Sequence, residues 1–363
     1  MIPNLGKGGA EKVLVNLVNH IDPERYEVYI FCLKKEGDLL SFVKHGVQVV
    51  DIDSPRAYFS IFAIRKAVKK IRPHVLFGWL GHVNAILAFF RPMLPRDLVL
   101  LCRESSIPSL FIRHYTLPFL FKFLYRFYNR YDGIVCQSVA MKDDLVNNFN
   151  VKPGKIRVIS NPVVPSVGGG RQVSGIARSF LSGNNKKLLF VGRFSAEKRV
   201  QLIIESLALL PNDFKLVIIG YGGFETELRS LINNKGLSER VLIINDCNDP
   251  TPYYKLADCV LLSSSFEGFP NVLLEANMQG CPVVVYETRG GAREIVNSNN
   301  GIYINPGSDL EIFADSILEA CLPGRFDRGQ ISEQTEKEYN IGKKTSEYLD
   351  YIEGFLTTTK HPL

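Results

Sequence analysis

The sequence has little that would support a disulfide framework, an exported protein or a membrane span. Its seven cysteines are scattered over 363 residues, and no two of them form a CxxC pair. An odd number of cysteines, most of them in or beside apolar runs, indicates buried free thiols in a reducing compartment. No apolar run reaches about 18 residues and the N-terminus has no secretory pattern, so we expect neither a spanning helix nor export.

Charge is unevenly distributed in a composition that is otherwise typical of a soluble globular protein. The chain is 46% apolar and 22% charged, and its length suits two domains. Residues 1–162 contain 23 Lys and Arg against 13 Asp and Glu, whereas the remainder contains 20 against 24. The basic first half indicates an anionic partner, which could be membrane phospholipid, a lipid phosphate or a nucleic acid. An ordinary solvated surface is the alternative.

Short apolar runs alternate with helical patterns in both halves of the chain. Near-continuous apolar runs are typical of strands that are buried on both faces of a parallel sheet. The alternation predicts crossover connections, and therefore an α/β fold with two doubly wound sheets. The expected strands are 26–33, 47–53, 74–80, 98–104, 133–138 and 156–160, followed by 187–193, 214–220, 241–245, 259–264 and 281–286.

A stretch rich in Pro, Gly and Ser separates the two series of runs. We predict a first domain at 1–162, a linker at 163–180, a second domain at 181–325 and a helical tail at 326–363 that packs back towards the first domain. Ligands of such sheets bind outside the carboxyl ends of the strands, so two domains facing across a cleft predict a site in that cleft.

The stretch GRFSAEK places Gly192 and Arg193 at the end of an expected strand and Lys198 where the next helix begins. Two cations beside a helix N-terminus suit a phosphate or diphosphate, because the free backbone N–H groups point the same way. Solvated charges flanking a turn are the alternative.

The stretch NLGKGGAEK is the counterpart in the first half. Gly8 and Gly9 precede an expected helix, so the backbone there can approach a ligand closely. The spacing fits neither a dinucleotide fingerprint nor a P-loop. A flexible turn is the alternative.

Two carboxylates stand eight positions apart in SSSFEGFPNVLLEANMQG. Glu267 lies in a turn after an expected strand, and Glu275 lies about one turn into the following helix. Carboxylates are strong acceptors that suit sugar hydroxyls, and the N–H groups of residues 268–271 suit phosphate or sugar oxygens. The alternatives are that the helix dipole stabilises the Glu275 carboxylate and that Glu267 is an ordinary turn residue.

Together these stretches resemble the retaining glycosyltransferases of family four, which have the GT-B fold of two Rossmann-like domains. The second half carries the resemblance almost throughout, including GCPVVVYETRGGAREIV and DPTPYYKLADCVLLSS, while GGAEKVLVNL and SNPV carry it in the first half. The Glu-x7-Glu spacing is moderately specific by itself, and its combination with Gly-Arg-x4-Lys is strongly so.

The resemblance implies roles for these positions. Arg193, Lys198 and Glu267 would be catalytic: the two cations would stabilise the departing nucleotide, and Glu267 would contact the donor sugar or steady charge at the anomeric carbon. Glu275 would accept hydrogen bonds from the ribose. The remaining donor-binding positions would be Gly8, Gly9, Gly192, Gly268, Phe269, Asn271 and Val272. No metal or other cofactor is expected if Arg, Lys and backbone dipoles carry the leaving charge.

Three positions depart from the family pattern. Only a few residues remain of the usual first strand, so we expect either a late start or a short first sheet. Asn245 stands where a glycine is usual, which leaves base recognition open. No His of the first domain stands in a clear motif, and we take His82, Arg103 and Glu104 as acceptor candidates.

Residues 109–133 interleave aromatic residues with arginine and lysine. This stretch could lie in a membrane interface with its cations near lipid headgroups. A helix packed under the first sheet is the alternative, and no RNA-binding motif accompanies the stretch.

The sequence thus predicts a glycosyltransferase that moves a hexosyl or N-acetylhexosaminyl group from a UDP- or GDP-sugar to a glycan or lipid-linked acceptor. The expected setting is bacterial surface polysaccharide synthesis on the cytoplasmic side, peripheral to the membrane, without nucleic acid. A nucleotide-sugar epimerase of GT-B fold and a non-catalytic sugar-nucleotide-binding subunit remain alternatives.

Overall fold

The structure, a computed structural model, describes residues 1–53, 60–114, 116–164, 173–245, 247 and 249–358. The chain forms two compact units: Met1–Val164 with Tyr339–Leu363 is unit 1, and Pro165–Glu338 is unit 2. The predicted linker at 163–180 lies partly outside the described residues. Its described end contains a short helix, α7 (Gly175–Phe180), whose N-cap Ser174 accepts a hydrogen bond from the Ala177 amide.

Unit 1 contains a four-stranded parallel sheet in the order β3-β4-β5-β6 and a parallel pair β1-β2. Every residue of β4 and β5 is buried, as the continuous apolar runs predict. The strands are β1 (Val28–Cys32), β2 (Val47–Asp51), β3 (Val75–Gly78), β4 (Val99–Arg103), β5 (Gly133–Cys136) and β6 (Ile156–Val158).

The first residues of the chain lie beside both parts of this sheet. The Ile2 amide donates to Phe31 O at 2.9 Å on the β1 side, and the Trp79 amide donates to Met1 O at 3.1 Å on the β3 side. The few residues of the expected first strand therefore join β1 to β3. With them in place, the order of strands reverses direction at the boundary between Met1–Ile2 and β3, which is the topological switch point of this sheet.

The helices of unit 1 begin and end where local sequence signals indicate. Ser138 caps α6 by accepting a hydrogen bond from the Met141 amide. α2 ends at Arg72, which has a left-handed backbone and precedes a proline. The helices are α1 (Gly9–Val18), α2 (Ile61–Ile71), α3 (Gly81–Phe89), α4 (Pro108–Phe111), α5 (Pro118–Leu124), α6 (Val139–Phe149) and α15 (Ile341–Thr358), with a 3-10 segment η4 (Tyr125–Arg130).

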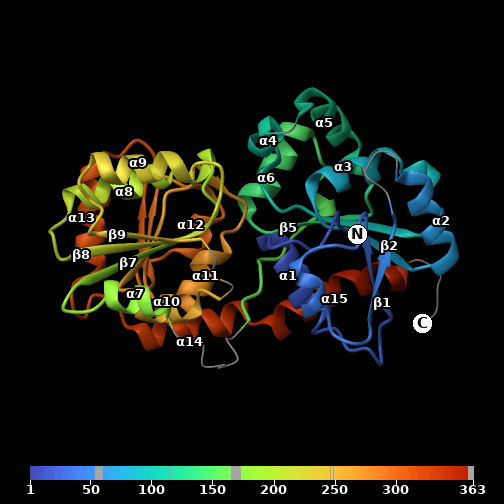
Figure 1. Ribbon diagram of the computed structural model, residues 1–363. Helices are drawn as coiled ribbons and strands as arrows, with labels where there is room; N and C mark the ends of the chain where they lie inside the picture. Colours follow the sequence, from blue (N-terminus) through green and yellow to red (C-terminus); the bar gives the residue numbers. More distant parts are fainter. Residues whose placement is uncertain (54–59, 115, 165–172, 246, 248, 359–363) are drawn as a thin grey trace. The chain divides into compact units, whose positions relative to one another are not determined.

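Unit 2 is built on a six-stranded parallel sheet in the order β14-β12-β10-β7-β8-β9 (Figure 1). The five predicted strands are present, and the sequence reading missed the sixth, β14. The order reverses between β7 and β10, so the loops that follow these two strands meet at a switch point. The strands are β7 (Lys186–Val191), β8 (Phe214–Ile219), β9 (Val241–Ile244), β10 (Cys259–Leu262), β12 (Val283–Tyr286) and β14 (Gly301–Ile304).

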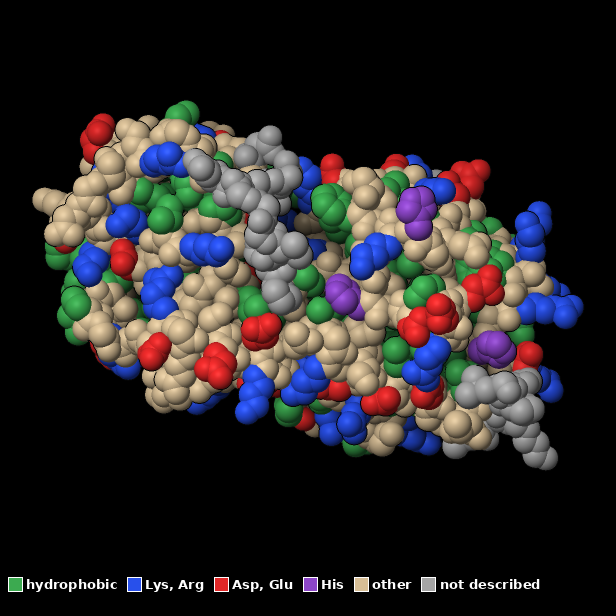
Figure 2. All heavy atoms as spheres, turned by 90° about the horizontal axis from the view of Figure 1, so that it is seen from below, with side chains coloured by type: hydrophobic (Ala, Val, Ile, Leu, Met, Phe, Trp, Pro, Cys, Tyr) green, Lys and Arg blue, Asp and Glu red, His purple; other side chains and the backbone are tan. Residues whose placement is uncertain are grey.

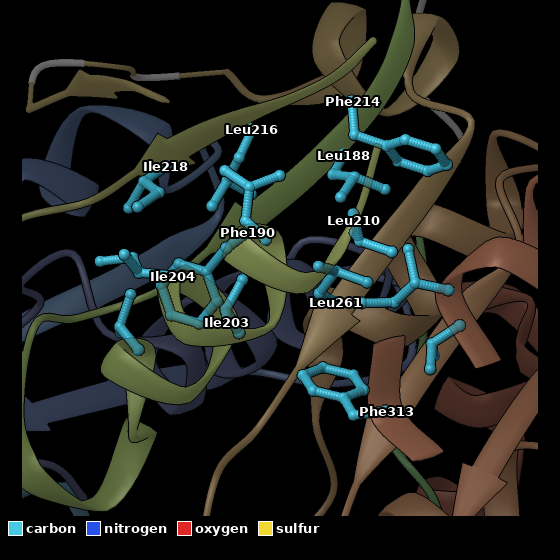
Figure 3. Packing of buried hydrophobic residues seen from close by; sticks show 14 of the residues in the cluster. Leu188, Phe190, Ile203, Ile204, Leu210, Phe214, Leu216, Ile218, Leu261 and Phe313 are labelled. Carbon is cyan, nitrogen blue, oxygen red and sulfur yellow. The ribbon is translucent and has the colours of Figure 1, made fainter. Parts of the chain in front are cut away.

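The core of unit 2 lies between this sheet and helices that include α8 and α13. Figure 3 shows Ile203 and Ile204 of α8 and Phe313 of α13 packed against side chains of β7, β8 and β10. Burial of such side chains is the main source of stability for the layers. The helices are α8 (Val200–Leu209), α9 (Glu225–Asn234), α10 (Thr251–Leu256), α11 (Asn271–Met278), α12 (Ala292–Ile295), α13 (Leu310–Ala320) and α14 (Arg328–Tyr339).

The C-terminal tail is divided between the two units. α14 packs on unit 2, where Arg328 Nη1 donates to Ala257 O at 2.8 Å and Ser332 Oγ donates to Met278 O at 2.7 Å. α15 belongs to unit 1 and contacts α1. The tail that the sequence predicts as one piece thus contributes one helix to each unit.

Charged side chains are interspersed on the face drawn in Figure 2, where Lys and Arg alternate with Asp and Glu. Among the described residues, no helix is long and apolar enough to cross a membrane.

Candidate functional site

The loop after β7 carries the predicted cations at the switch point of unit 2. It passes through Gly192 and Arg193 to a 3-10 turn, η6 (Ala196–Lys198), and α8 begins at Val200. Arg193 is largely exposed, and its Nη2 lies 3.8 Å from Glu197 Oε1. The guanidinium is therefore loosely held and accessible to an anion.

Two glycines after β8, which sequence reasoning did not single out, support this loop. A Cβ on Gly220 would lie 1.8 Å from Gly192 O, and one on Gly222 would lie 2.3 Å from Phe194 O. The Phe194 amide also donates to Tyr221 O at 2.8 Å. Both glycines have positive φ, so close packing and backbone conformation each require glycine here. Their place at the end of an expected strand was the available signal.

Lys198 and Glu267 form an ion pair across the switch point. Lys198 Nζ lies 2.5 Å from Glu267 Oε1, and the side chains are 19% and 15% exposed. Ser264 Oγ donates to the same carboxylate oxygen at 2.6 Å. The structure thus brings together two of the three predicted catalytic side chains, from the loops after β7 and β10.

The backbone of Glu267 is fixed by the loop after β12. β11 (Phe266–Glu267) pairs in parallel with β13 (Arg289–Gly290). The Gly291 amide donates to Glu267 O at 3.2 Å. This small sheet, which the sequence reading did not predict, holds the carboxylate at the carboxyl end of the main sheet.

Glu275 lies on α11, one turn from its first residue, as predicted. Tyr254 of α10 donates its hydroxyl to Glu275 Oε2 at 3.0 Å. Tyr254 is buried, and burial beside this carboxylate raises the pKa of its hydroxyl well above its usual value, so the phenol remains a donor. Tyr254 is a second residue that sequence reasoning missed.

The other predicted donor-binding residues of this loop surround the start of α11. Gly268 and Phe269 are buried, whereas Asn271 and Val272 are half-buried at the first turn. The Leu273 amide already donates to Pro270 O at 3.1 Å. Residues 271 and 272 are the first two of α11, at the end of a helix that can bind an anion.

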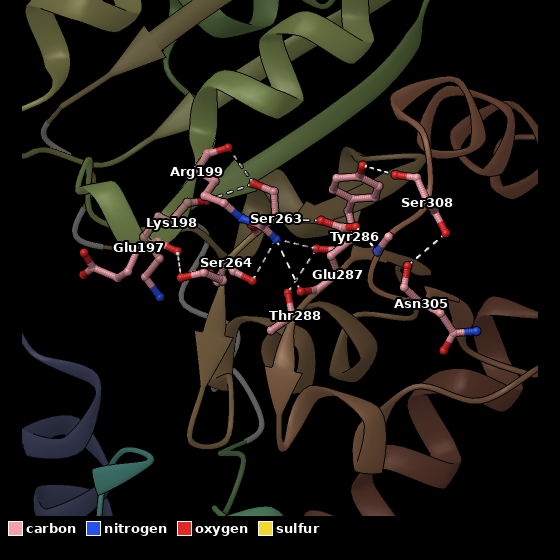
Figure 4. A network of polar contacts seen from close by, with 12 residues as sticks. Glu197, Lys198, Arg199, Ser263, Ser264, Tyr286, Glu287, Thr288, Asn305 and Ser308 are labelled. Carbon is pink, nitrogen blue, oxygen red and sulfur yellow. Dashed lines mark hydrogen bonds and ion pairs between the residues drawn. The ribbon is translucent and has the colours of Figure 1, made fainter. Parts of the chain in front are cut away.

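Arg199 holds three loops together at this edge, as Figure 4 shows. Its Nε donates to Ser263 O at 2.6 Å, its Nη2 to Tyr286 O at 3.2 Å, and its Nη1 to Glu287 Oε2 at 3.2 Å. These acceptors lie after β10 and at the end of β12. The sequence reading gave Arg199 no role, and no local pattern distinguishes it from a solvated arginine.

Asn245, which follows β9, is part of a polar network. Asn245 Oδ1 accepts from Arg229 Nη2 at 3.4 Å, and its amide donates to Glu225. The neighbouring residues 246 and 248 lie outside the described residues.

In unit 1, Gly8 and Gly9 open α1 as predicted, with Gly8 as the N-cap. The Glu11 carboxylate folds back over Gly8, because a Cβ there would lie 2.0 Å from Glu11 Oε2. Trp79 Nε1 donates to Ala10 O at 2.8 Å, which ties the end of β3 to α1 across the switch point.

The three acceptor candidates of unit 1 are enclosed to different degrees. His82, the second residue of α3, is half-buried, and burial lowers its pKa. Arg103 is 0% and Glu104 is 2% exposed. The structure therefore places Arg103 and Glu104 inside unit 1 rather than on a surface that an acceptor could reach directly.

Arg103 and Glu104 belong to one buried polar network. Arg103 Nε donates to Tyr348 Oη at 3.1 Å and its Nη2 to Asn161 Oδ1 at 2.5 Å, while Nη1 has no hydrogen-bond partner among the described residues. The Glu104 carboxylate accepts from Tyr128 and from Asn84. Burial raises the pKa of Glu104.

No group of three or more His, Cys, Asp or Glu side chains is arranged to hold a metal ion in the described part of the chain. The chemistry that this arrangement offers comes from Arg193 and the Lys198–Glu267 pair beside a helix N-terminus. Such a set can bind a diphosphate and adjacent hydroxyl groups.

Comparison with known proteins identifies the class. A model described as glycosyl transferases group 1 matches residues 176–337, and one described as glycosyltransferase family 4 matches residues 7–167. The protein is a glycosyltransferase of GT-B fold. It belongs to the group 1 glycosyltransferases, as the resemblance predicted.

Relatives and solved structures agree with this assignment. The chain is 28% identical to a Campylobacter jejuni N-acetylgalactosamine-N,N'-diacetylbacillosaminyl-diphospho-undecaprenol 4-alpha-N-acetylgalactosaminyltransferase, over 86% of this chain and 87% of that one. It is 32% identical to a lipopolysaccharide core biosynthesis glycosyltransferase of Rhizobium meliloti, over 53% and 54%. The crystal structure of Anabaena HepE in complex with UDP superimposes with a TM-score of 0.78 and 19% identity, over 97% and 98%.

Proposed function

We propose that this protein is a retaining glycosyltransferase that moves a hexosyl or N-acetylhexosaminyl group from a UDP- or GDP-sugar to a glycan or lipid-linked acceptor in bacterial surface polysaccharide synthesis. The observation that carries the proposal is the contact of Lys198 with Glu267 at the switch point of unit 2. One relative is named for transfer to an undecaprenol-linked sugar and another for lipopolysaccharide core synthesis. These names support a glycan or lipid-linked acceptor.

The donor binds with its diphosphate at Arg193 and Lys198. These cations and the N–H groups at the start of α11 stabilise the charge that develops on the departing nucleotide. Glu267 contacts the hydroxyls of the donor sugar, or steadies charge at the anomeric carbon. The contact of Lys198 with Glu267 supports adjacent subsites for the diphosphate and the sugar.

Glu275 accepts hydrogen bonds from the ribose hydroxyls. Its Oε2 is held by Tyr254, which fixes the orientation of the carboxylate relative to α11. A ribose offers two neighbouring donors, and a carboxylate held in one orientation suits them.

We propose that transfer needs no metal, since Arg193, Lys198 and the helix N-terminus supply positive charge. Full activity after dialysis against EDTA is the expected result. Loss of activity with EDTA and its return with Mg²⁺ or Mn²⁺ would overturn this part. Proton NMR of the product would give the anomeric configuration, which retention requires to be that of the donor.

The first test is calorimetric binding of UDP, GDP and ADP and their common sugar conjugates to the wild type and to Glu275→Ala. Saturable binding of one nucleotide, weakened in the variant, is the expected result. Binding of none of them would contradict the donor site. A subunit without catalysis would bind nucleotide yet transfer nothing, and an epimerase would convert the donor without any acceptor.

We also propose that residues 109–133 contact an anionic membrane from the cytoplasmic side. Its apolar side chains at 117, 119, 120 and 123 are exposed, and Phe119 is 88% exposed. Exposed cations at 113, 122 and 126 lie in the same stretch. The opposite side of the stretch is buried through Tyr125 and Tyr128, so it packs on unit 1 while presenting an apolar and basic face.

Sedimentation with phosphatidylglycerol vesicles tests this contact, with phosphatidylcholine vesicles as the neutral surface. The double variant Phe119→Ser/Phe123→Ser should bind phosphatidylglycerol several-fold more weakly. Phe42→Ser is the control, because it removes a phenylalanine elsewhere in unit 1 whose exposure of 64% lies between those of Phe119 and Phe123. The contact would be contradicted if the wild type, the double variant and Phe42→Ser bound phosphatidylglycerol vesicles equally, or if none of them bound.

A further inference from the structure

Arg199 follows Lys198 directly and has an unusual backbone. Its φ and ψ are 47° and 42°, in the left-handed region, and it is the residue before α8 begins. Residues other than glycine rarely adopt this conformation, which persists only where the surroundings hold it. Contacts of its own side chain help to hold Arg199 in this conformation.

The guanidinium uses all three of its nitrogens on neighbouring loops. The bonds to Ser263 O, Tyr286 O and Glu287 Oε2 are joined by longer contacts of Nη2, at 3.4 Å each, to Ser264 O and Glu287 O. The side chain is 22% exposed, so it is a mostly enclosed group rather than a surface charge. A planar fork of N–H donors suits several carbonyl groups converging on one point, which a lysine could not match.

The loop after β10 also donates hydrogen bonds to the loop that carries Lys198 and Arg199. Ser263 Oγ lies 2.9 Å from Lys198 O and 3.0 Å from Arg199 O. Ser264, the next residue, holds the Glu267 carboxylate. The connections therefore form a closed circuit: Lys198 is bonded along the chain to Arg199, Arg199 to residues 263 and 264, Ser264 to Glu267, and Glu267 back to Lys198.

We infer that Arg199 is a positioning residue of the donor site. Its guanidinium fixes the loop that carries Lys198 against the loop that carries Glu267, and anchors both to the end of β12. The distance between the diphosphate and sugar subsites is set by this anchor. The inference rests on the proposed function, in which Lys198 and Glu267 bind neighbouring parts of one sugar nucleotide.

Arg240 offers a matched control within the same unit. It also donates to backbone carbonyls, from Nε to Phe214 O at 3.0 Å and from Nη2 to Pro211 O at 2.7 Å. It precedes β9 and contacts the start of β8, so it lies at the amino ends of the strands, away from the switch-point loops. Loss of either arginine removes comparable carbonyl contacts.

The experiment compares Arg199→Met and Arg240→Met with the wild type. Methionine is unbranched and has the same difficulty as arginine in a left-handed backbone, so the substitution removes only the guanidinium. Peptide-level hydrogen exchange is measured over 195–200, 263–271 and 286–291. Calorimetry then gives the affinity for UDP and GDP, and for UDP-N-acetylgalactosamine and GDP-mannose.

In Arg199→Met we expect exchange in all three segments to accelerate about tenfold, because their amides share the lost anchor. The dissociation constant of the bound sugar nucleotide should rise at least about tenfold, since small displacements of a binding group are costly. Arg240→Met should accelerate exchange around 210–216 and leave the affinity unchanged. Arg199→Lys, which keeps the charge without the fork, should resemble Arg199→Met, and it replaces that variant if the methionine protein does not fold.

The inference would be overturned if Arg199→Met and Arg240→Met showed the same exchange in these three segments, or the same nucleotide affinity. Faster exchange in Arg199→Met with unchanged affinity would also overturn it. A wild type that binds none of the four nucleotides would instead contradict the proposed function. In that case the exchange data still decide whether Arg199 anchors the three loops.

Discussion

The switch points of the two sheets differ in whether their charged side chains are exposed or enclosed. In unit 2, the loops after β7 and β10 bring Lys198 and Glu267 together with part of each side chain still exposed. In unit 1, the corresponding place between Met1–Ile2 and β3 is packed, with the Trp79 indole bonded to Ala10 O and enclosed beneath Arg103. The same strand order thus produces an accessible charged edge in one unit and a closed one in the other.

Two arginines make the difference concrete. Arg193 follows β7, and its side chain is 64% exposed and lies 3.8 Å from Glu197. Arg103 ends β4 and is fully buried, with its guanidinium 4.7 Å from the Trp79 ring and bonded to Tyr348 of α15. An arginine at the carboxyl end of a strand is thus accessible to a ligand where it is open, the role that we propose for Arg193, and holds a helix where it is covered.

Of the substitutions that compare the two arginines, Arg103→Ala should have the largest effect, which is on the stability of unit 1. Loss of a buried guanidinium leaves Asn161 and Tyr348 without their donor, so unit 1 should lose about 3 kcal/mol of unfolding free energy. Urea unfolding followed by fluorescence measures this loss, because Trp79 is the only tryptophan and lies beside Arg103.

Arg25→Ala is the control for this experiment. Arg25 also contacts α15, through Glu353 at 3.1 Å, but its side chain is 65% exposed. An exposed pair contributes little, so its loss should cost less than about 0.5 kcal/mol. If Arg103→Ala costs no more than Arg25→Ala, the buried guanidinium does not stabilise the closed edge of unit 1.

Arg193→Ala should give the opposite pattern. Its exposed side chain contributes little to folding, so stability should remain within about 0.5 kcal/mol of the wild type. Turnover should fall at least about tenfold, which corresponds to about 1.4 kcal/mol of transition-state stabilisation. Initial rates of sugar transfer, or of donor cleavage, provide the measurement. Near-normal rates would remove Arg193 from the diphosphate site.

The sequence predicted the six strands of unit 1 and five of the six strands in the main sheet of unit 2, because continuous apolar runs indicate burial on two faces. It also predicted the loops of Lys198 and Glu267 and the helix that carries Glu275, since glycine and proline mark the turns before these helices. It could not predict that Arg103 and Glu104 are enclosed, because their partners are set by the fold: Arg103 is bonded to Tyr348 of α15, 245 residues later, and Glu104 to Asn84 and Tyr128. The role of Arg199 was missed for a related reason: all but one of its acceptors are backbone carbonyls, which carry no sequence signal.

Tyr254→Phe tests whether the open edge also depends on a buried support. The variant removes one hydrogen bond to Glu275, so affinity for UDP or GDP should fall about fivefold, or about 1 kcal/mol. The loss should disappear with the corresponding 2′,3′-dideoxynucleotide, which lacks the hydroxyls that Glu275 would bind. Tyr253→Phe, on the same helix, is the control. An equal loss with the dideoxynucleotide would show that Tyr254 does not act through the ribose.

The smallest effect concerns Glu104 and the pH dependence of unit 1. Burial raises its pKa in the folded state, so the folded protein binds a proton more tightly there than the unfolded chain does. The corresponding stability is fully present below the usual pKa of glutamate and is lost as the pH rises through the raised value. In Glu104→Gln this loss should vanish, so the stability of the variant relative to the wild type should increase between pH 4.5 and pH 8. Trp79 fluorescence in urea at several pH values measures it, with exposed Glu24→Gln as the control for removing a carboxylate. A stability difference that is constant over this range would mean that the hydrogen bonds from Asn84 and Tyr128 offset the burial of the carboxylate, and that the closed edge of unit 1 tolerates charge as the open edge of unit 2 does.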